Sequence, residues 1–527
     1  MATKYWVGGD GNWSSLTNWR TTSGGAIITT APGSTDAAVL DANSGTSVVT
    51  VDSSITIQTL TCTGFTGTLA FGTNTISLNS TGTIFTGATT MTVTGTPQII
   101  CTNSSATART ITPTAVTEAN SISFRVTAGT GTFTVSSTTS IRNIDFTDGT
   151  NPTGYSGAAT FGTMTIYGDF KASTGMTCPA SANATTFAAT SGTKTINTAG
   201  VTFDRPFTFN GVGGTWQLQS ALTSGATRTC TLTNGTLDLA GYTLTTGIFG
   251  SSNSNVRSIA FGTGNITLTQ NAATIWSCST ATNLTITGTP NVNATYSGAV
   301  GTRTFTQGTG SIESNVVNFN VTDGTDIISG TINVKNFNFT GFSGTLTNNA
   351  ARNIYGDVTI SSTMTLDAGA NPFNFRTTVG TQQITTNGKT LDFPITFLGV
   401  GGTYAFQDAL TQGSTRTFTI TAGTVQLKNG VTSTVGSFVA NNSSVKFLQS
   451  TTSGSQATLS QASGTVNVVD LTIRDINAVG GASWNAYTDF ENTDAGNNDG
   501  WNFSLSPPYS TAELPITLRP FTQPRRF

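Results

Sequence analysis

Histidine is absent from this chain of 527 residues, and only 9% of the residues are charged. Without an imidazole the chain cannot form a Ser-His-Asp or Cys-His catalytic site, or a metal site with a histidine ligand. The formal net charge is -2 and no basic face is visible, which argues against a nucleic-acid partner. We therefore expect no cofactor, no metal ion and no bound nucleic acid.

Long apolar runs are missing as well. No stretch reaches the roughly 18 apolar residues of a membrane span, so we expect no membrane insertion. The N-terminal "MATKYWVGGDGNW" also lacks the apolar core of a secretory signal.

Cysteine is scarce, and its five positions are Cys62, Cys101, Cys178, Cys230 and Cys278. Their number is odd, and no two have a metal-binding or redox spacing. We predict buried apolar side chains in a chain made in a reducing host cytoplasm.

Thr, Ser, Gly and Asn dominate what is present, and apolar residues alternate with them. In "TCTLTNGTLDLAGYTLTT", residues 229–246, Cys230, Leu232, Leu237 and Leu239 occupy every second position on either side of an "NG" turn. Alternation broken by such turns predicts short strands, and no helical stripe competes with it. Thirty-one phenylalanines argue against disorder.

An internal duplication organises the chain. "IYGD" occurs at 166–169 and 354–357, and "GVGGT" at 211–215 and 399–403, both shifted by 188 residues. "TGTP" at 94–97 and 287–290 extends the match upstream. We predict two solenoid modules, 61–250 and 251–430, between an N-terminal capping or attachment region, 1–60, and C-terminal turns, 431–503.

Turns of roughly twenty to thirty residues predict an all-β, elongated parallel β-solenoid of about twenty turns. The alternative is a series of β-sandwich domains with Greek-key connections. No linker of different composition separates the modules, which favours the solenoid.

Tryptophan gathers at the two ends, at Trp6, Trp13 and Trp19 and at Trp484 and Trp501. A solenoid exposes apolar interior and unpaired backbone at its first and last turns, and large aromatic side chains can cover them. We predict end caps or docking structures. A sugar-binding platform of exposed Trp is the alternative.

The last segment, 504–527, holds five of the chain's 14 prolines and is predicted to be an extended tail. We expect it to bind a neighbouring subunit through Leu514, Ile516, Leu518, Arg519 and Phe521.

Acids offer little sign of catalysis, and we predict no catalytic residues. Asp169 and Asp204 recur as Asp357 and Asp392 in the second module, which favours turn residues that bind nearby backbone N–H groups. A special site should instead lie where the modules differ. The candidates on this criterion are Glu118, Glu313 and the charged pair Asp326 and Lys335.

The Trp-rich ends also carry a resemblance. "YWVGGDGNWSSLTNW", followed by "SGG" and "APGSTDAAVLDANS", and the closing "WNAYTDFENTDAGNNDGWNF" resemble the first and last segments of repetitive β-rich structural proteins of tailed bacteriophages. "NGTLDLAGYTLTT" resembles their solenoid turns. The resemblance covers most of the chain except the proline-rich tail, and it assigns no catalytic residues.

This resemblance implies a virion structural protein, a tail fibre or tailspike that recognises the host surface. It implies a homo-oligomer, commonly a trimer, in contact with other tail or capsid proteins and with a host-surface glycan or protein. Alternatives are a tailspike that depolymerises polysaccharide with Asp and Glu, a head fibre or decoration protein, and a bacterial surface adhesin.

Overall fold

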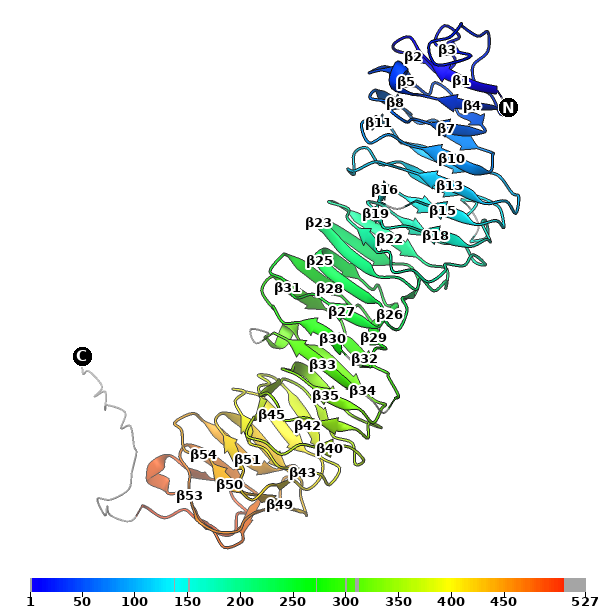
Figure 1. Ribbon diagram of the computed structural model, residues 1–527. Coiled ribbons are helices and arrows are strands. Elements are labelled where there is room, and N and C mark those ends of the chain that lie inside the picture. Colours follow the sequence, from blue (N-terminus) through cyan, green and yellow to red (C-terminus); the bar gives the residue numbers. More distant parts are fainter. Residues whose placement is uncertain are drawn as a thin grey trace, which may run out of the picture.

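The chain forms an elongated rod. The computed structural model describes residues 2–136, 138–149, 152–271, 273–298, 301–308 and 312–506. These wind into an all-β solenoid of about 19 turns, with the first strands at one end of the rod and the last at the other (Figure 1). At about 4.8 Å per turn the rod is roughly 90 Å long. The predicted solenoid is confirmed, and the alternative of tandem sandwiches is wrong.

Each turn contributes strands to three faces, on which successive turns pair in parallel. Face 1 comprises β6 (Ile55–Ile57), β9 (Thr75–Leu78), β12 (Gln98–Cys101), β14 (Ser123–Val126), β17 (Ile144–Asp145), β20 (Phe170–Lys171), β22 (Thr193–Asn197), the C-terminal parts of β23 (Phe207–Leu218) and β25 (Thr229–Asp238), β28 (Arg257–Ala260), β31 (Leu284–Thr287), β38 (Arg352–Ile354), β41 (Phe373–Phe375), β44 (Ile395–Phe397), β47 (Thr417–Ile420), β50 (Ser437–Val439), β53 (Thr465–Asn467), β56 (Ser483–Asn485) and β58 (Trp501–Asn502).

Face 2 comprises β1 (Ala2–Trp6), β4 (Asp36–Val39), β7 (Thr59–Thr61), β10 (Gly82–Thr86), β13 (Arg109–Thr112), β15 (Phe133–Val135), β18 (Ala159–Phe161), β24 (Leu222–Thr223), β26 (Thr243–Thr246), β29 (Asn265–Leu268), β32 (Asn291–Ala294), β34 (Val317–Val321), the C-terminal part of β36 (Asn333–Asn338), β39 (Val358–Thr359), β42 (Thr381–Thr385), β45 (Thr403–Phe406), β48 (Gly423–Leu427), β51 (Lys446–Ser450), β54 (Leu471–Arg474) and β57 (Thr493–Asp494). The N-terminal part of β36 lies on face 1, where it pairs with β38.

Face 3 comprises β2 (Gly11–Asn12), β5 (Val48–Thr50), β8 (Thr68–Ala70), β11 (Thr92–Thr94), β16 (Thr139–Ile141), β19 (Met164–Ile166), β21 (Thr185–Phe187), the N-terminal parts of β23 and β25, β27 (Ile248–Gly250), β30 (Ala273–Cys278), β33 (Thr302–Gln307), β35 (Ile327–Ser329), β37 (Thr345–Leu346), β40 (Thr365–Leu366), β43 (Thr390–Leu391), β46 (Thr411–Gln412), β49 (Thr432–Val435), β52 (Ala457–Gln461) and β55 (Ile476–Val479). The edge strand β3 (Trp19–Arg20) and the 3-10 turns η1 (Ala42–Ser44), η2 (Glu313–Asn315) and η3 (Thr488–Phe490) complete the described elements.

The alternation seen in the sequence sets the burial of these strands. In β9, Ile76 and Leu78 are fully buried while the residues before each are half-buried. Side chains at successive strand positions point to opposite faces of a sheet, so every second residue enters the interior. The β-branched and aromatic residues at these positions stack on their counterparts in the turns before and after, and they form one continuous core.

The internal repeat does not fill a whole number of turns. β12 and β31 both lie on face 1, and eight successive parallel pairings lead from one to the other. The counterpart of β12 in the second module is β32, because "TGTP" precedes both strands. β32 pairs with β29 and β34 on face 2. One repeat therefore spans eight turns and one further face, so the two modules present their equivalent surfaces on different sides of the rod.

Buried arginines interrupt the apolar core at the ends of several strands. They are Arg109, Arg205, Arg257, Arg303 and Arg352. In the first module the guanidinium of Arg109 donates to the carbonyls of Asn103 and Ala128. The counterpart of Arg109 in the second module is Arg303, which donates from Nε and Nη2 to both carboxylate oxygens of the fully buried Asp326, at 2.6 and 2.7 Å.

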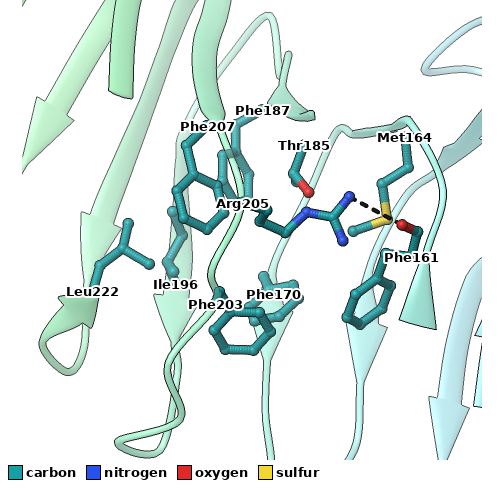
Figure 2. Close-up of a pocket in the computed structure, with 10 residues that line it drawn as sticks. All are labelled: Phe161, Met164, Phe170, Thr185, Phe187, Ile196, Phe203, Arg205, Phe207 and Leu222. Carbon is teal, nitrogen blue, oxygen red and sulfur yellow. Dashed lines mark hydrogen bonds between the residues drawn. The ribbon is translucent and has the colours of Figure 1, made fainter. Parts of the chain in front are cut away.

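Arg205 fills a corner of the first module (Figure 2). Its Nη2 donates to the carbonyls of Phe161, Gly162 and Asn183. The guanidinium carbon lies 5.3 Å from the centre of the Phe161 ring. The cavity beside it has a volume of about 10 Å³, which is room for about one water molecule and too little for a larger ligand.

The second module fills the equivalent corner from another strand. Met164, Thr185 and Arg205 of the first module correspond to Arg352, Phe373 and Phe393. Arg352 donates to the carbonyls of Thr347 and Ala350 and lies over the Phe373 ring. The arginine has therefore moved two turns along the rod, although each corner still holds one guanidinium.

Candidate functional site: a polar groove in the first module

The N-terminal Trp cluster lies inside the first turn. Trp6, Trp13 and Trp19 are all buried, with the Trp19 ring centre 5.2 Å from that of Trp6 and 4.9 Å from that of Trp13. The indole N–H of Trp19 donates to the carbonyl of Trp13, and that of Trp6 to the carbonyl of Gly9. β1 and β3 run antiparallel, unlike every other strand pair of the described residues. These side chains present no aromatic surface to solvent, and their role as an end cap stays a prediction.

The C-terminal Trp pair lies in the last turns. Trp484 and Trp501 face each other across β56 and β58, with ring centres 5.0 Å apart. Both contact Phe438, which continues a column of phenylalanines on face 1. Trp484 is buried, whereas Trp501 is partly exposed. The tail residues Leu514, Ile516, Leu518, Arg519 and Phe521 lie outside the described residues.

The recurring aspartates divide into two groups. Asp169 and Asp357 accept hydrogen bonds from backbone N–H groups, as predicted, but the donors are Thr195 and Gln383, 26 residues along the chain, each at 2.7 Å. Asp204 and Asp392 behave differently from the prediction. They form ion pairs with Arg228 and Arg416, at 2.6 and 2.7 Å, because these arginines follow in the next turn.

The prediction that Glu118 and Glu313 mark places where the modules differ is wrong. Each glutamate reaches three turns along the rod to equivalent threonines. Glu118 Oε2 accepts from the hydroxyl of Thr190 at 2.7 Å, and Glu313 Oε2 from the hydroxyl of Thr378 at 2.8 Å. We call the segments that carry them, 113–121 and 312–316, the straps.

Asp326 and Lys335 do not form a charged pair either. Asp326 binds Arg303 in the interior. Lys335 precedes Asn336 and Phe337, which correspond to Asn143 and Ile144, so its counterpart is Arg142. The sequence comparison missed these matches because the shift between modules changes from 188 to about 195 residues upstream.

The cysteines are free thiols. Cys62, Cys101, Cys230 and Cys278 are buried, and Cys178 is half-buried. Burial raises the pKa of the Cys62 and Cys101 thiols to about 12, so they stay protonated at neutral pH. The four buried thiols agree with the predicted role as apolar core residues, and Cys178 does not.

A groove of about 400 Å³ crosses face 1 of the first module. It extends from Gln98 in β12, over β14, β17, β20 and β22, to Gln219 after β23. The residues between its polar side chains, such as Phe124, Ile144 and Phe170, point into the core. The groove floor is therefore the outer side of five successive strands.

Three charged side chains occupy one column of this floor. Arg125, Asp145 and Lys171 lie in register on β14, β17 and β20. The Nε atom of Arg125 lies 3.3 Å from a carboxylate oxygen of Asp145. Arg125 and Lys171 are two turns apart, which places their Cα atoms about 10 Å from each other.

The second module has an uncharged floor at the same place. Asn320, Asn338 and Thr359 are the counterparts of the three charged residues, in register on β34, β36 and β39. The Asn320 amide donates to the Asn293 amide oxygen at 2.9 Å. The two modules therefore differ at a surface site, as expected of a special site. The residues that differ, Arg125, Asp145 and Lys171, were not among the candidates chosen from the sequence.

No protein-family model, curated protein or solved structure matches this chain. Among the described residues, no helix has the length and apolar character needed to cross a bilayer. The described part of the chain also gathers no three Cys, Asp or Glu side chains in an arrangement that would hold a metal ion.

Proposed function

We propose that this chain is a structural protein of a tailed-bacteriophage virion, a tail fibre or spike that recognises the host surface. The observation that carries the proposal is the rod of about 19 stacked turns with tryptophan clusters in its first and last turns. A solenoid stiffened by continuous parallel ladders is suited to hold a binding surface at a distance from an attachment point. The resemblance of both ends to phage structural proteins supports the same function.

The proposal includes assembly as a homotrimer, with the tail 504–527 on a neighbouring subunit. Light scattering of the full chain and of a variant lacking 504–527 tests this part. A trimer that dissociates on deletion is expected. An unchanged mass after deletion would remove the tail from the interface.

The location is tested on intact phage particles. Antibodies against the rod should label the tail, and the purified chain should compete with phage for adsorption to host cells. Label on the head would favour a head fibre or decoration protein. Particles without label would overturn the proposal and favour a bacterial surface adhesin.

Depolymerisation of a host polysaccharide is the second candidate, because two carboxylates, Asp145 and Asp169, lie in the groove one turn apart. Glycoside hydrolysis needs a pair of carboxyl groups about 5 to 9 Å apart, one of which keeps a proton. Each carboxylate already accepts a hydrogen bond from a threonine of this module, Asp145 from Thr147 and Asp169 from Thr195. Incubation of the chain with host polysaccharide tests this, and released reducing ends would establish the enzyme.

A further inference from the structure

The groove of the first module has hydrogen-bond donors that nothing in the described structure uses. Lys171 makes no hydrogen bond or ion pair with any described residue, and its ammonium group carries three donors. Arg125 is paired with Asp145 through its buried Nε atom, and its Nη1 and Nη2 groups donate to no described residue. The side-chain amide of Asn197, in line with Lys171, donates to no described residue.

The acceptors of the groove, in contrast, are occupied. Asp145 Oδ1 accepts from the backbone N–H and the hydroxyl of Thr147, at 2.8 and 2.7 Å. Asp169 Oδ1 accepts from the backbone N–H and the hydroxyl of Thr195, at 2.7 and 2.9 Å. A ligand that enters this groove therefore meets free donors on two cationic side chains, and two carboxylates that each already accept two hydrogen bonds at Oδ1.

The second module shows that the fold does not require these charges. Its equivalent floor carries Asn320, Asn338 and Thr359, and amide groups there bind each other. Asn318 donates to Asn291 and Asn320 to Asn293, each at 2.9 Å. Since both floors lie on the same kind of strand stack, the cations of the first module have no structural role that uncharged polar side chains could not fill.

We propose that this groove binds an acidic carbohydrate, a polysaccharide segment whose carboxylate groups reach Arg125 and Lys171. The inference deepens the proposed function and rests on it, because it names the class of ligand that the recognising rod would bind. Two cations about 10 Å apart suit acid groups on alternate sugars of an extended chain. Gln98, Asn197 and Gln219 offer amides to the hydroxyl groups between them.

A nucleic acid fits this groove less well. Stacking of bases needs exposed aromatic side chains, and the one aromatic residue that lines the groove, Phe124, is buried in the core.

The test uses the full chain and three probes in calorimetric titrations. These are an oligogalacturonate of six sugars, maltohexaose as its neutral match, and an oligothymidylate. We expect the oligogalacturonate to bind, the neutral sugar to bind at least about tenfold more weakly, and added salt to weaken the acidic sugar. No binding of the oligogalacturonate, or tighter binding of the oligothymidylate, would overturn the inference.

The variant Arg125→Asn/Lys171→Thr gives the first module the residues of the second at its two cationic positions. These residues are already tolerated in the second module, so the variant should fold and melt like the wild type. We expect a loss of at least about tenfold in affinity for the oligogalacturonate. Lys389→Thr/Lys428→Thr removes two cations outside the groove and should bind unchanged. Equal affinity of Arg125→Asn/Lys171→Thr and the wild type for the oligogalacturonate would refute the proposal.

A gain of binding completes the test. Asn320→Arg/Asn338→Asp/Thr359→Lys transfers the charged column to the second module and should raise the number of bound oligogalacturonates from one to two per chain. Failure of the groove and failure of the proposed function are distinguishable, because antibody labelling of the virion does not depend on any sugar. A chain present on the tail whose groove binds no acidic sugar would refute this inference alone.

Discussion

The first and second modules share one fold but place their charges in opposite ways. The first module carries Arg125, Asp145 and Lys171 in a groove on its surface. Its buried Arg109 donates hydrogen bonds to backbone carbonyls. The second has an amide floor on its surface and buries an ion pair in its core, between Arg303 and Asp326. Core positions are tightly constrained by packing, whereas outward positions of a strand stack can change without loss of the fold. The duplication thus separates residues that build the rod from residues that give one part of it a surface of its own.

The largest effect on stability is expected at the buried ion pair of the second module. Asp326→Ala leaves the fully buried charge of Arg303 without a partner. We expect the free energy of unfolding to fall by roughly 3–5 kcal/mol, measured by urea denaturation with circular dichroism. Asp392→Ala is the control, since it removes the partly exposed pair with Arg416 and should cost about 0–1 kcal/mol. Equal losses would show that burial does not distinguish the two pairs.

Substitution of Arg205, which the second module replaces by Arg352 two turns away, should have the next largest effect on the free energy of unfolding. Arg205→Ala leaves the carbonyls of Phe161, Gly162 and Asn183 without their donor and opens space in the core. We expect a loss of roughly 2–4 kcal/mol, measured in the same urea experiment.

A compensating variant sharpens this prediction. Met164→Arg/Thr185→Phe/Arg205→Phe gives the first module the residues of the second at all three positions. It should recover most of the stability lost by Arg205→Ala. If it is no more stable than Arg205→Ala, the two corners are not interchangeable.

Lys446 and Arg257 extend the comparison to the following repeat. They pair with Gly423 and Gly235 at equivalent strand ends, and both are buried. Burial lowers the pKa of Lys446 from 10.5 to about 8. Between these values the unfolded chain binds the extra proton, so this lysine makes the folded state more stable as the pH rises.

The variant Lys446→Arg keeps its charge over this range and should lack that dependence. From about pH 7 to about pH 10 the stability of the wild type relative to the variant should rise by up to a few kcal/mol. Thermal melts of both proteins across this range measure the difference. The buried thiols act in the opposite direction, because burial raises their pKa, but they are common to both proteins and cancel. Parallel melting curves at every pH would contradict the lowered pKa.

Substitutions in the straps should have the smallest effect on stability, and the two modules should respond most alike to them. Glu118→Ala and Glu313→Ala each remove hydrogen bonds to an exposed threonine, at a cost of about 1 kcal/mol, and Glu313→Ala removes a further one to the buried Thr377. Hydrogen exchange at the backbone amides of Thr190 and Thr378 should quicken in the respective variant. The control Glu118→Gln keeps an acceptor and should change exchange less. An effect in one module only would mean that the straps are not equivalent.

Much of the fold could be predicted from the sequence, because alternation, turn residues and a long repeat each have a local cause. "NG" turns and apolar residues at every second position specify strands whatever surrounds them. The rotation by one face could not be predicted, since it depends on the number of residues in every turn. Arg125 and Asp145 are 20 residues apart, whereas Asp145 and Lys171 are 26 apart, yet both pairs lie in register.

The groove escaped sequence analysis for the same reason. Arg125, Asp145 and Lys171 stand in three separate strands, and no local motif links them. An alignment of the two modules strand by strand would have shown a charged residue against an uncharged one at all three positions. The shift of about 195 residues at Arg125 and Asn320, against 188 at Lys171 and Thr359, hid that correspondence.

The repeat of eight turns and one face amounts to a screw operation along the rod. Three applications would return a strand to the face from which it started, and the two modules use two of these three orientations. A flat partner parallel to the rod can therefore engage equivalent surfaces of only one module at a time, so duplication adds no avidity toward it. Insertion of one further module would turn everything beyond it by one face, and so change which side of the rod the C-terminal turns present.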